Sequence, residues 1–363
     1  MKGVLNLGKL FNVKIEVHWT FIFILLWVIF LELKSGGTLQ NAMMSIVFIA
    51  LLFTCVVFHE FGHILTARKF GVTAKKITLL PIGGVASMET IPENPKQELL
   101  ISLAGPAVNI FIALILSLFI NISFFFDQDP KQLEEALSHV TPQNLLIYLF
   151  SANIALAIFN FIPAFPMDGG RVLRAILAMK TDRVTATNIA SGIGQFIALI
   201  FVFVGILYNP FLILIALFIF FGAYGENKMV RQLALLKGHK VHDAMLTNIS
   251  VLKPDDTIKD AIELLLSGTE KNFVITQNSQ IEGILYHQNI IKNSKKPDIA
   301  LQDVMDRSFT SIDVNADLKD IFKLINTEKR DFFVVKDNNA LVGAIDLSNL
   351  SEFMLIQANL ISR

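Results

Sequence analysis

The stretch that decides the fold is His59-Glu60-Phe61-Gly62-His63, which lies inside an almost wholly apolar run from Ala42 to Thr66. Residues four apart share one face of a helix, so His59 and His63 can present two imidazoles to the same metal ion. Zinc suits this arrangement, because two His, one further ligand and one open position make a catalytic site. Glu60 lies beside the pair, where it can act on a water molecule activated by the metal. The apolar setting strengthens this prediction, since ionisable groups in lipid are costly and usually functional.

The composition divides the chain into an apolar part and a soluble part. The 363 residues are 53% apolar and 17% charged, with a formal net charge of zero and a single cysteine, Cys55. Zero net charge gives no bulk basic surface for nucleic acid, so we expect no direct nucleic-acid binding. One cysteine excludes both an internal disulfide and a cysteine zinc cluster. Because residues 18–225 are membrane-like and residues 240–363 are not, we predict a polytopic α-helical membrane protein with a C-terminal α/β unit.

Six apolar segments are long enough, or nearly so, to span a bilayer core of about 30 Å. They are Trp19–Leu33, Ala42–Lys69, Glu98–Phe126, Leu145–Phe161, Ala186–Leu207 and Phe211–Tyr224. Lysine and arginine gather at the N-terminus and after the second, fourth and sixth segments, whereas the other loops are poor in them. The positive-inside rule then places both termini in the cytoplasm. We therefore predict six transmembrane helices in a multi-pass protein of the plasma membrane.

The second informative stretch is Asn160–Arg171, with the sequence NFIPAFPMDGGR. Its two prolines break a helix, and its two glycines free the backbone to turn before a new helix begins near Arg171. Asp168 is an isolated carboxylate on this broken backbone and is a candidate third metal ligand, with a helix N-cap as its alternative role. The two His need a third partner, which favours ligation. Glu60 would then act as general base and pass the proton to the leaving amine, and Asn160 could donate to the oxyanion or between helices.

Two further motifs in the apolar part have structural interpretations. Lys76–Leu80 and Val85–Met88 predict strands separated by Gly83-Gly84. Backbone of this kind at membrane depth must line a cavity or be covered by protein, unless it forms an ordinary cytoplasmic hairpin. In the third segment, Ala104-Gly105-Pro106 and Asn109 predict close packing of helices, because small residues allow helices to approach.

The soluble part contains an internal repeat. Asp243-Ala244-Met245 matches Asp303-Val304-Met305, and Phe273-Val274-Ile275 matches Phe333-Val334-Val335, both at an offset of 60 residues. In each unit, the hydrophobic pattern predicts a short strand, an amphipathic helix, two strands joined by a turn and a second helix. The sequence therefore predicts two copies of one small α/β unit.

The motifs of the apolar part together resemble the site-2 protease family of intramembrane zinc metalloproteases. The matching pieces are His59-Glu60-Phe61-Gly62-His63, Gly83-Gly84-Val85, Ala104-Gly105-Pro106 with Asn109, and Asn160…Pro163…Asp168-Gly169. The resemblance covers residues 1–230 and implies one zinc ion held by His59, His63 and Asp168. It implies Glu60 as the catalytic acid and base, and Asn160 as a substrate or oxyanion contact. It also implies regulated intramembrane proteolysis of a membrane-spanning or membrane-tethered protein, such as an anti-sigma factor or a transcription factor precursor.

The soluble part looks like a tandem CBS pair, with repeats at 240–298 and 299–363. Such pairs commonly bind adenine nucleotides and regulate a fused catalytic or transport domain. Their nucleotide-binding units usually carry Ser or Thr three residues past a glycine and Asp six residues past it. Here those positions hold Tyr286 and Asn289, then Asp346 and Asn349. Two roles therefore stay open for the pair: it senses an adenine nucleotide, or it is a structural or dimerising pair. The branch of the site-2 protease family that this chain resembles most carries cytoplasmic CBS domains, as does the stage IV sporulation protein FB.

Two other functions compete with proteolysis. A CBS-regulated transporter or channel could bind zinc as cargo, but it would be expected to show repeated halves or several membrane-embedded charges along a path. A catalytically silent zinc-binding scaffold would need the ligands but not Glu60. The ionisable groups of the apolar part gather at one site, and Glu60 is present there. Both observations favour the intramembrane protease.

Overall fold

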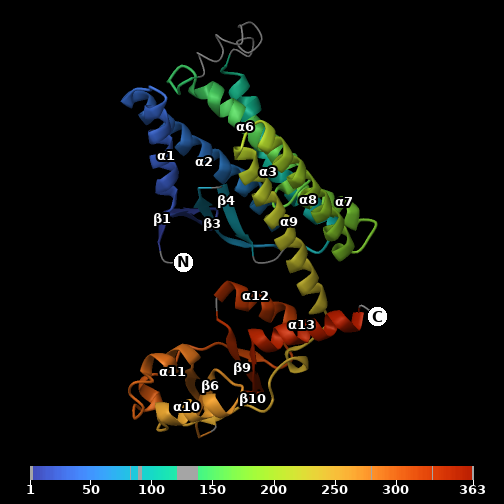
Figure 1. Ribbon diagram of the computed structural model, residues 1–363. Helices are drawn as coiled ribbons and strands as arrows, with labels where there is room; N and C mark the ends of the chain where they lie inside the picture. The colour runs from blue at the N-terminus through green and yellow to red at the C-terminus, as the bar shows by residue number, and fades with distance from the viewer. Residues whose placement is uncertain are drawn as a thin grey trace. The chain divides into compact units, whose positions relative to one another are not determined.

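The computed structural model describes residues 3–81, 83–88, 92–120, 138–278, 280–328 and 330–361 (Figure 1). The chain divides into two compact units, Met1–Lys228 and Met229–Arg363. The first consists of long apolar helices and one small sheet, and the second consists of short strands and helices in two similar halves.

Each of the six predicted apolar segments forms a helix. The helices are α1 (Phe21–Lys34), α2 (Leu39–Arg68), α3 (Pro95–Ser117), α6 (Leu145–Phe161), α8 (Arg183–Leu207) and α9 (Phe211–Leu235). Four of them, α2, α3, α8 and α9, are long and apolar enough to cross a membrane, while α6 has 17 residues and α1 has 14. The count of six crossings therefore stays a prediction. The end of the third predicted segment, up to Phe126, lies outside the described residues.

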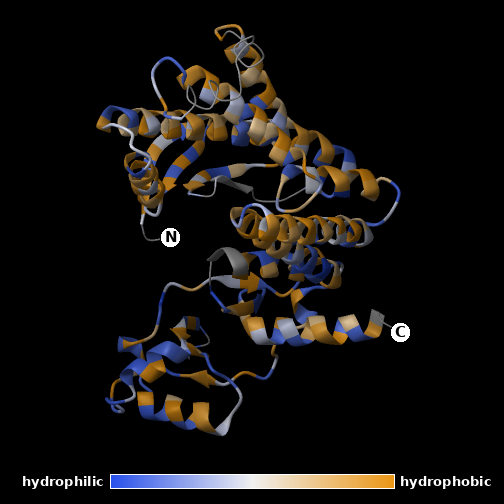
Figure 2. Cartoon of the chain, turned by 45° about the horizontal axis from the view of Figure 1, so that its top comes forward, coloured by the Kyte–Doolittle hydropathy of each residue, from blue (hydrophilic) through white to orange (hydrophobic). Residues whose placement is uncertain are grey.

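The helices of the first unit expose many large apolar side chains and bury several polar ones. Figure 2 shows these helices as mostly hydrophobic, whereas the second unit mixes hydrophobic and hydrophilic residues. Large side chains such as Phe111 and Phe203 are more than 60% exposed, while Asn109, Asn153 and Ser191 are almost completely buried. Lipid tails match an apolar outer surface, and buried polar groups in such a unit need partners within the protein. This is the pattern of a membrane protein.

A four-stranded sheet, with the order β1-β2-β3-β4, accompanies the helices. Its strands are β1 (Val4–Leu10), β2 (Val13–His18), β3 (Ala74–Leu80) and β4 (Gly83–Met88). The two strands predicted from Lys76–Leu80 and Val85–Met88 are confirmed as parts of β3 and β4, which pair antiparallel. Ile77 and Leu79 of β3 pack with Phe53 and Phe61 of α2, so the sheet lies against the helix that carries the His motif.

The turn between α6 and the next helix, α7 (Asp168–Ala178), differs from expectation in two ways. Helix α7 begins at Asp168 rather than near Arg171, so both glycines lie in its first turn. A Cβ atom on Gly169 would lie 2.2 Å from the Ile162 carbonyl oxygen, and one on Gly170 would lie 2.6 Å from the Ala164 carbonyl carbon. The glycines are therefore needed because the incoming chain folds tightly against α7, rather than for backbone freedom.

The second unit contains the two predicted halves. The first has β5 (Val251–Leu252), α10 (Ile258–Ser267), β6 (Phe273–Gln277), β7 (Gln280–Leu285) and α11 (His287–Asn293). The second has β8 (Ser311–Asp313), α12 (Leu318–Glu328), β9 (Phe332–Asp337), β10 (Ala340–Asp346) and α13 (Leu347–Ile361). Within each half, the first strand lies parallel to the middle strand and the last lies antiparallel to it. The predicted internal repeat is therefore confirmed.

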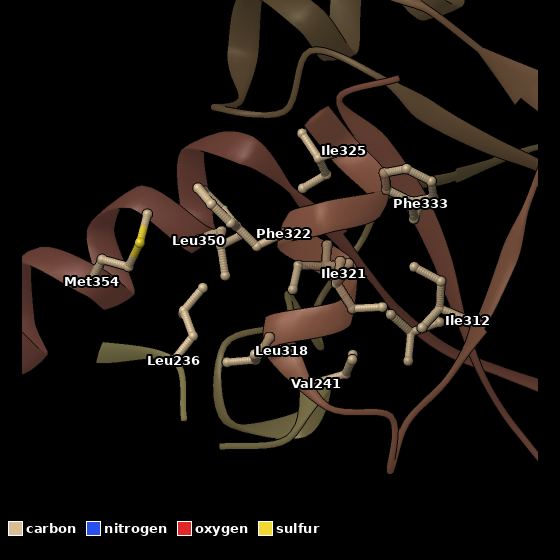
Figure 3. Close-up of a cluster of buried hydrophobic side chains, with 12 residues drawn as sticks. Leu236, Val241, Ile312, Leu318, Ile321, Phe322, Ile325, Phe333, Leu350 and Met354 are labelled. Carbon is tan, nitrogen blue, oxygen red and sulfur yellow. The ribbon is translucent and has the colours of Figure 1, made fainter. Parts of the chain in front are cut away.

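Reciprocal backbone bonds join the two halves. Leu246, ahead of the first half, exchanges hydrogen bonds with Ala344 of β10, and Asp306, ahead of the second half, does the same with Ile284 of β7. The core of the second half gathers Leu318, Ile321, Phe322 and Ile325 from one face of α12, as Figure 3 shows. This helical spacing buries one stripe of α12 and explains why the amphipathic pattern could be read from the sequence.

Candidate metal centre

Three predicted ligands converge on one buried point. His59 Nε2 and His63 Nε2 are 3.0 Å apart, and Asp168 Oδ2 lies 3.2 Å from the first and 3.1 Å from the second. All three side chains are buried. Ligand atoms at about 2.0–2.1 Å from a tetrahedral zinc ion lie roughly 3.3 Å from one another. Within the part of the chain that the structure describes, no other group of three His, Cys, Asp or Glu ligands comes together in this way. The donor set therefore fits zinc.

The second ring nitrogen of each His has an acceptor. His63 Nδ1 lies 2.7 Å from the carbonyl oxygen of Ile101, and His59 Nδ1 lies 2.5 Å from Asn109 Oδ1. Oxygen atoms of this kind accept hydrogen bonds, so each neutral imidazole carries its proton on Nδ1. Each Nε2 lone pair then faces the common point with Asp168. Both tautomers are the ones that a metal requires.

Two glycines allow α2 and α3 to approach closely enough for these contacts. A Cβ atom on Gly62 would lie 2.6 Å from the Ala104 carbonyl oxygen, and one on Gly105 would lie 2.1 Å from His63 Nε2 and 2.7 Å from His59 Nε2. The predicted close packing at Ala104-Gly105-Pro106 is confirmed. The structure adds that Gly105 also leaves room for the two imidazoles.

Glu60 lies next to the sheet. An added Cβ atom on Gly84 would lie 3.0 Å from Glu60 Cγ and 3.3 Å from Glu60 Oε1, so the backbone of β4 passes directly beside this carboxyl group. Glu60 follows His59 in α2 and is partly exposed, unlike the two His. The three candidate ligands, the carboxyl group of Glu60 and the backbone of β4 therefore lie close together.

Asn160 does not join the ligand group. Its Nδ2 donates to the carbonyl oxygen of Leu156, 3.0 Å away in the same helix, and the side chain is partly exposed near the end of α6. This bond lies within α6, whereas the alternative considered from the sequence was a bond between helices. The oxyanion role of Asn160 stays a prediction.

Arg174 shows what the sequence reasoning missed. In the sequence it counts as one of several loop charges that set the membrane orientation, but its side chain is completely buried in α7. Its Nε donates to Glu98 of α3 at 2.9 Å, its Nη groups pair with Glu98 and with Glu226 of α9, and its guanidinium stacks 4.9 Å from the Phe165 ring. Arg183 also pairs with Glu98, so two positive and two negative groups balance. The group ties α7, which carries Asp168, to α3.

Comparisons with known proteins assign both parts of the chain to families. The model of peptidase family M50 matches residues 47–205, and the CBS domain model matches residues 241–296 and 301–356. The chain is 36% identical over 358 residues to "Zinc metalloprotease MJ0392" of Methanocaldococcus jannaschii, covering 98% of this chain and 97% of that protein. It is 27% identical over 161 residues to "Stage IV sporulation protein FB" of Bacillus subtilis, covering 44% of this chain and 46% of that protein. Among solved structures, "Site-2 Protease from Methanocaldococcus jannaschii" is 41% identical, with a TM-score of 0.45, over 62% of this chain and 95% of that one.

The apolar helices and the buried His-His-Asp group define a membrane-embedded zinc metalloprotease. The chain belongs to peptidase family M50, the site-2 proteases, and carries a tandem CBS pair after the protease part. The resemblance inferred from the sequence motifs is thereby confirmed. Hydrolysis of peptide bonds within the membrane is its function, in preference to zinc transport or a silent scaffold.

The contact at Gly105 gives a test of the metal centre. Gly105→Ala should abolish zinc binding, because the new Cβ atom would occupy the space next to both Nε2 atoms. Gly192→Ala in α8 is the matched control, since nothing lies within 4 Å of a Cβ atom there. Elemental analysis of both purified proteins should find one zinc per chain in the control and none in Gly105→Ala. Equal zinc in the two variants would show that the metal binds elsewhere.

Proposed function

We propose that His59, His63 and Asp168 hold one catalytic zinc ion per chain and that Glu60 is the catalytic acid and base. The observation that carries this proposal is the convergence of three ligand atoms within 3.2 Å of one another at a buried point. Zinc, when bound, supplies a Lewis acid that polarises the scissile carbonyl and acidifies water. Zinc, Asp168 and Glu60 also sum to zero charge, which a site of low dielectric tolerates best.

The carboxyl group of Glu60 moves the proton in this mechanism. As a carboxylate it removes a proton from the attacking water, and as a carboxylic acid it then delivers that proton to the nitrogen of the leaving amine. Asn160 assists from the end of α6. A side-chain amide has two N–H donors, so one can bind Leu156 while the other contacts the substrate or the oxyanion.

The substrate is a membrane-spanning or membrane-tethered protein, such as an anti-sigma factor or a transcription factor precursor. A helix in lipid has its backbone groups bonded internally, so the substrate must unwind before its peptide bond can be attacked. Strand β4 offers a place to hold the unwound segment, because it is the last strand in the sheet order and no other described strand pairs with its outer edge. Gly84 of β4 lies beside Glu60. An extended substrate paired to this edge would be held next to the catalytic carboxyl group.

The membrane topology and domain boundaries form part of the same proposal. Six crossings place both termini in the cytoplasm and the enzyme in the plasma membrane. The protease domain spans 1–230, and the CBS repeats span 240–298 and 299–363. The division into two compact units and the residues matched by the CBS model support these boundaries. A homodimer formed through the CBS pair is the remaining part of the proposal.

The CBS pair binds an adenine nucleotide and thereby modulates the protease. Two polar atoms support this role: Tyr286 Oη and Asn349 Oδ1 are buried and have no hydrogen-bond partner among the described residues. Their residues lie three past Gly283 and six past Gly343, where nucleotide-binding relatives usually place ribose contacts. Buried polar atoms normally have hydrogen-bond partners, so these two unpartnered atoms favour a polar ligand bound next to them.

Replacement of the catalytic carboxyl group tests the proposed chemistry. Glu60→Gln keeps the size of the side chain but cannot take up a proton, so cleavage of a membrane substrate should fall by at least about 100-fold. Zinc should remain at one ion per chain, because Glu60 is not a ligand. The measurement is cleavage in proteoliposomes together with elemental analysis. Cleavage at the original rate would refute the role of Glu60.

Two adjacent prolines test the docking of substrate on β4. Neighbouring N–H groups in a strand point to opposite edges, so one of Val85→Pro and Ala86→Pro removes a donor from the open edge and the other removes one facing β3. The open-edge variant should cleave membrane substrates at least about tenfold more slowly while zinc stays bound, because one backbone bond to the substrate is lost. Wild-type cleavage by both variants would rule out this mode of binding.

Calorimetry tests the CBS pair. Titration of the full-length protein with AMP and with ATP should release heat, and Tyr286→Phe should weaken binding by roughly tenfold because one hydrogen bond to the ligand is lost. Ser267→Ala, at an exposed site in α10, is the control and should bind like the wild type. No heat at millimolar nucleotide would instead assign the pair a structural or dimerising role.

A further inference from the structure

A line of buried hydrogen bonds leads from one metal ligand, through α3, to the backbone of α6. His59 Nδ1 donates to Asn109 Oδ1, Asn109 Nδ2 donates to Asn153 Oδ1 at 2.9 Å, and Asn153 Nδ2 donates to the Leu149 carbonyl at 2.8 Å. Both Asn side chains are completely buried among apolar helices. The hydrogen bonds of the Asn153 side chain go to Asn109 and to Leu149, and no motif of the sequence singles it out.

The direction of every bond in this line is set at its far end. The Leu149 carbonyl can only accept, so Asn153 must turn its Nδ2 toward that carbonyl and its Oδ1 toward α3. Asn109 must then give its Nδ2 to Asn153, which leaves its Oδ1 facing His59. His59 therefore donates from Nδ1, and its Nε2 lone pair is free to face Asp168. One backbone carbonyl thus selects the tautomer of an imidazole three hydrogen bonds away.

Without Asn153 this selection is lost. The Asn109 amide could then rotate by half a turn and present Nδ2 to His59 at no cost in hydrogen bonds. A donor in that position favours the other tautomer, in which Nδ1 accepts and Nε2 carries the proton. A protonated Nε2 competes with a metal ion for the same atom. His63 needs no such relay, because the Ile101 carbonyl is its direct acceptor.

We propose that Asn153 is a positioning residue of the metal centre, which sets the tautomer of His59 through Asn109 and so raises the affinity for zinc. The proposal rests on the assignment of His59 as a zinc ligand under the proposed function. Its competitor is a packing role, in which the Asn109–Asn153 bond only holds α3 against α6. If Asn153 sets the tautomer of His59, a side chain at position 109 that can only accept should restore zinc affinity when Asn153 is replaced. If Asn153 only packs α3 against α6, it should not.

The test compares Asn153→Leu with a double variant that combines Asn153→Leu and Asn109→Asp. In the single variant the Asn109 amide is free to rotate, and zinc affinity should fall by about 10–100-fold, the usual effect of losing the partner of a metal-bound His. In the double variant, the carboxylate introduced at position 109 can only accept, so it holds His59 in the correct tautomer without help from position 153. Zinc affinity should return to within a few-fold of the wild type.

Zinc affinity is measured by competition with a chelator on the full-length protein, and thermal unfolding is measured on the metal-free protein. Thr187→Val is the control, because Thr187 is equally buried and bonds the Arg183 carbonyl within its own helix, α8, which carries none of the three ligands. This variant should keep wild-type affinity. If Asn153→Leu folds poorly, Asn153→Ser, which also lacks the reach to Asn109, should show the same loss.

Two results would overturn the proposal. Unchanged zinc affinity in Asn153→Leu and Asn153→Ser would show that Asn109 keeps its orientation unaided. A loss of affinity that the double variant does not repair, together with a lower unfolding temperature of the metal-free protein, would assign Asn153 to packing. If the wild-type protein binds no zinc, the ligand assignment itself fails and this proposal falls with it, which separates the two failures.

Discussion

Three electron-rich atoms brought to one buried point are the constraint on which the membrane part depends. The Nε2 atoms of His59 and His63 and an oxygen of Asp168 lie within 3.2 Å of one another, away from water. Such atoms repel unless a cation lies between them, and a charge in a site of low dielectric must be paired. A zinc ion meets both requirements, and its chemistry is the one that peptide hydrolysis needs.

Neighbouring contacts serve to keep these atoms together. Gly62 and Gly105 let α2 and α3 approach, so that oxygen atoms of α3 can accept from both imidazoles. The buried Arg174 ties α7 to α3, and therefore ties the helix that carries Asp168 to the helix that orients the His pair. Membrane helices associate through close packing and interhelical hydrogen bonds. Here, close packing, a relay of amides and a balanced charge group all involve α3, which they join to α2, α6 and α7.

The local patterns of the sequence predicted which three side chains converge, but not what orients them. His59 and His63 follow from helical spacing, and Asp168 follows from its isolation on broken backbone. The two CBS halves follow from a repeat whose buried positions keep the periods of strand and helix. Asn153 and Arg174 could not be assigned in this way, because their partners lie 44 and 76 residues away and depend on how helices cross. The start of α7 was also predicted wrongly, because the close approach of the chain at Gly169 decides the backbone path there.

X-ray absorption at the zinc edge of the purified full-length protein would show which atoms bind the metal. We expect one zinc ion per chain, with nitrogen and oxygen ligands at about 2.0–2.2 Å and the scattering pattern of two imidazoles. Asp168→Ala should remove one oxygen ligand and leave the imidazole pattern in place. Absence of zinc, a sulfur ligand, or a wild-type spectrum with fewer than two imidazoles would refute zinc ligation by His59, His63 and Asp168.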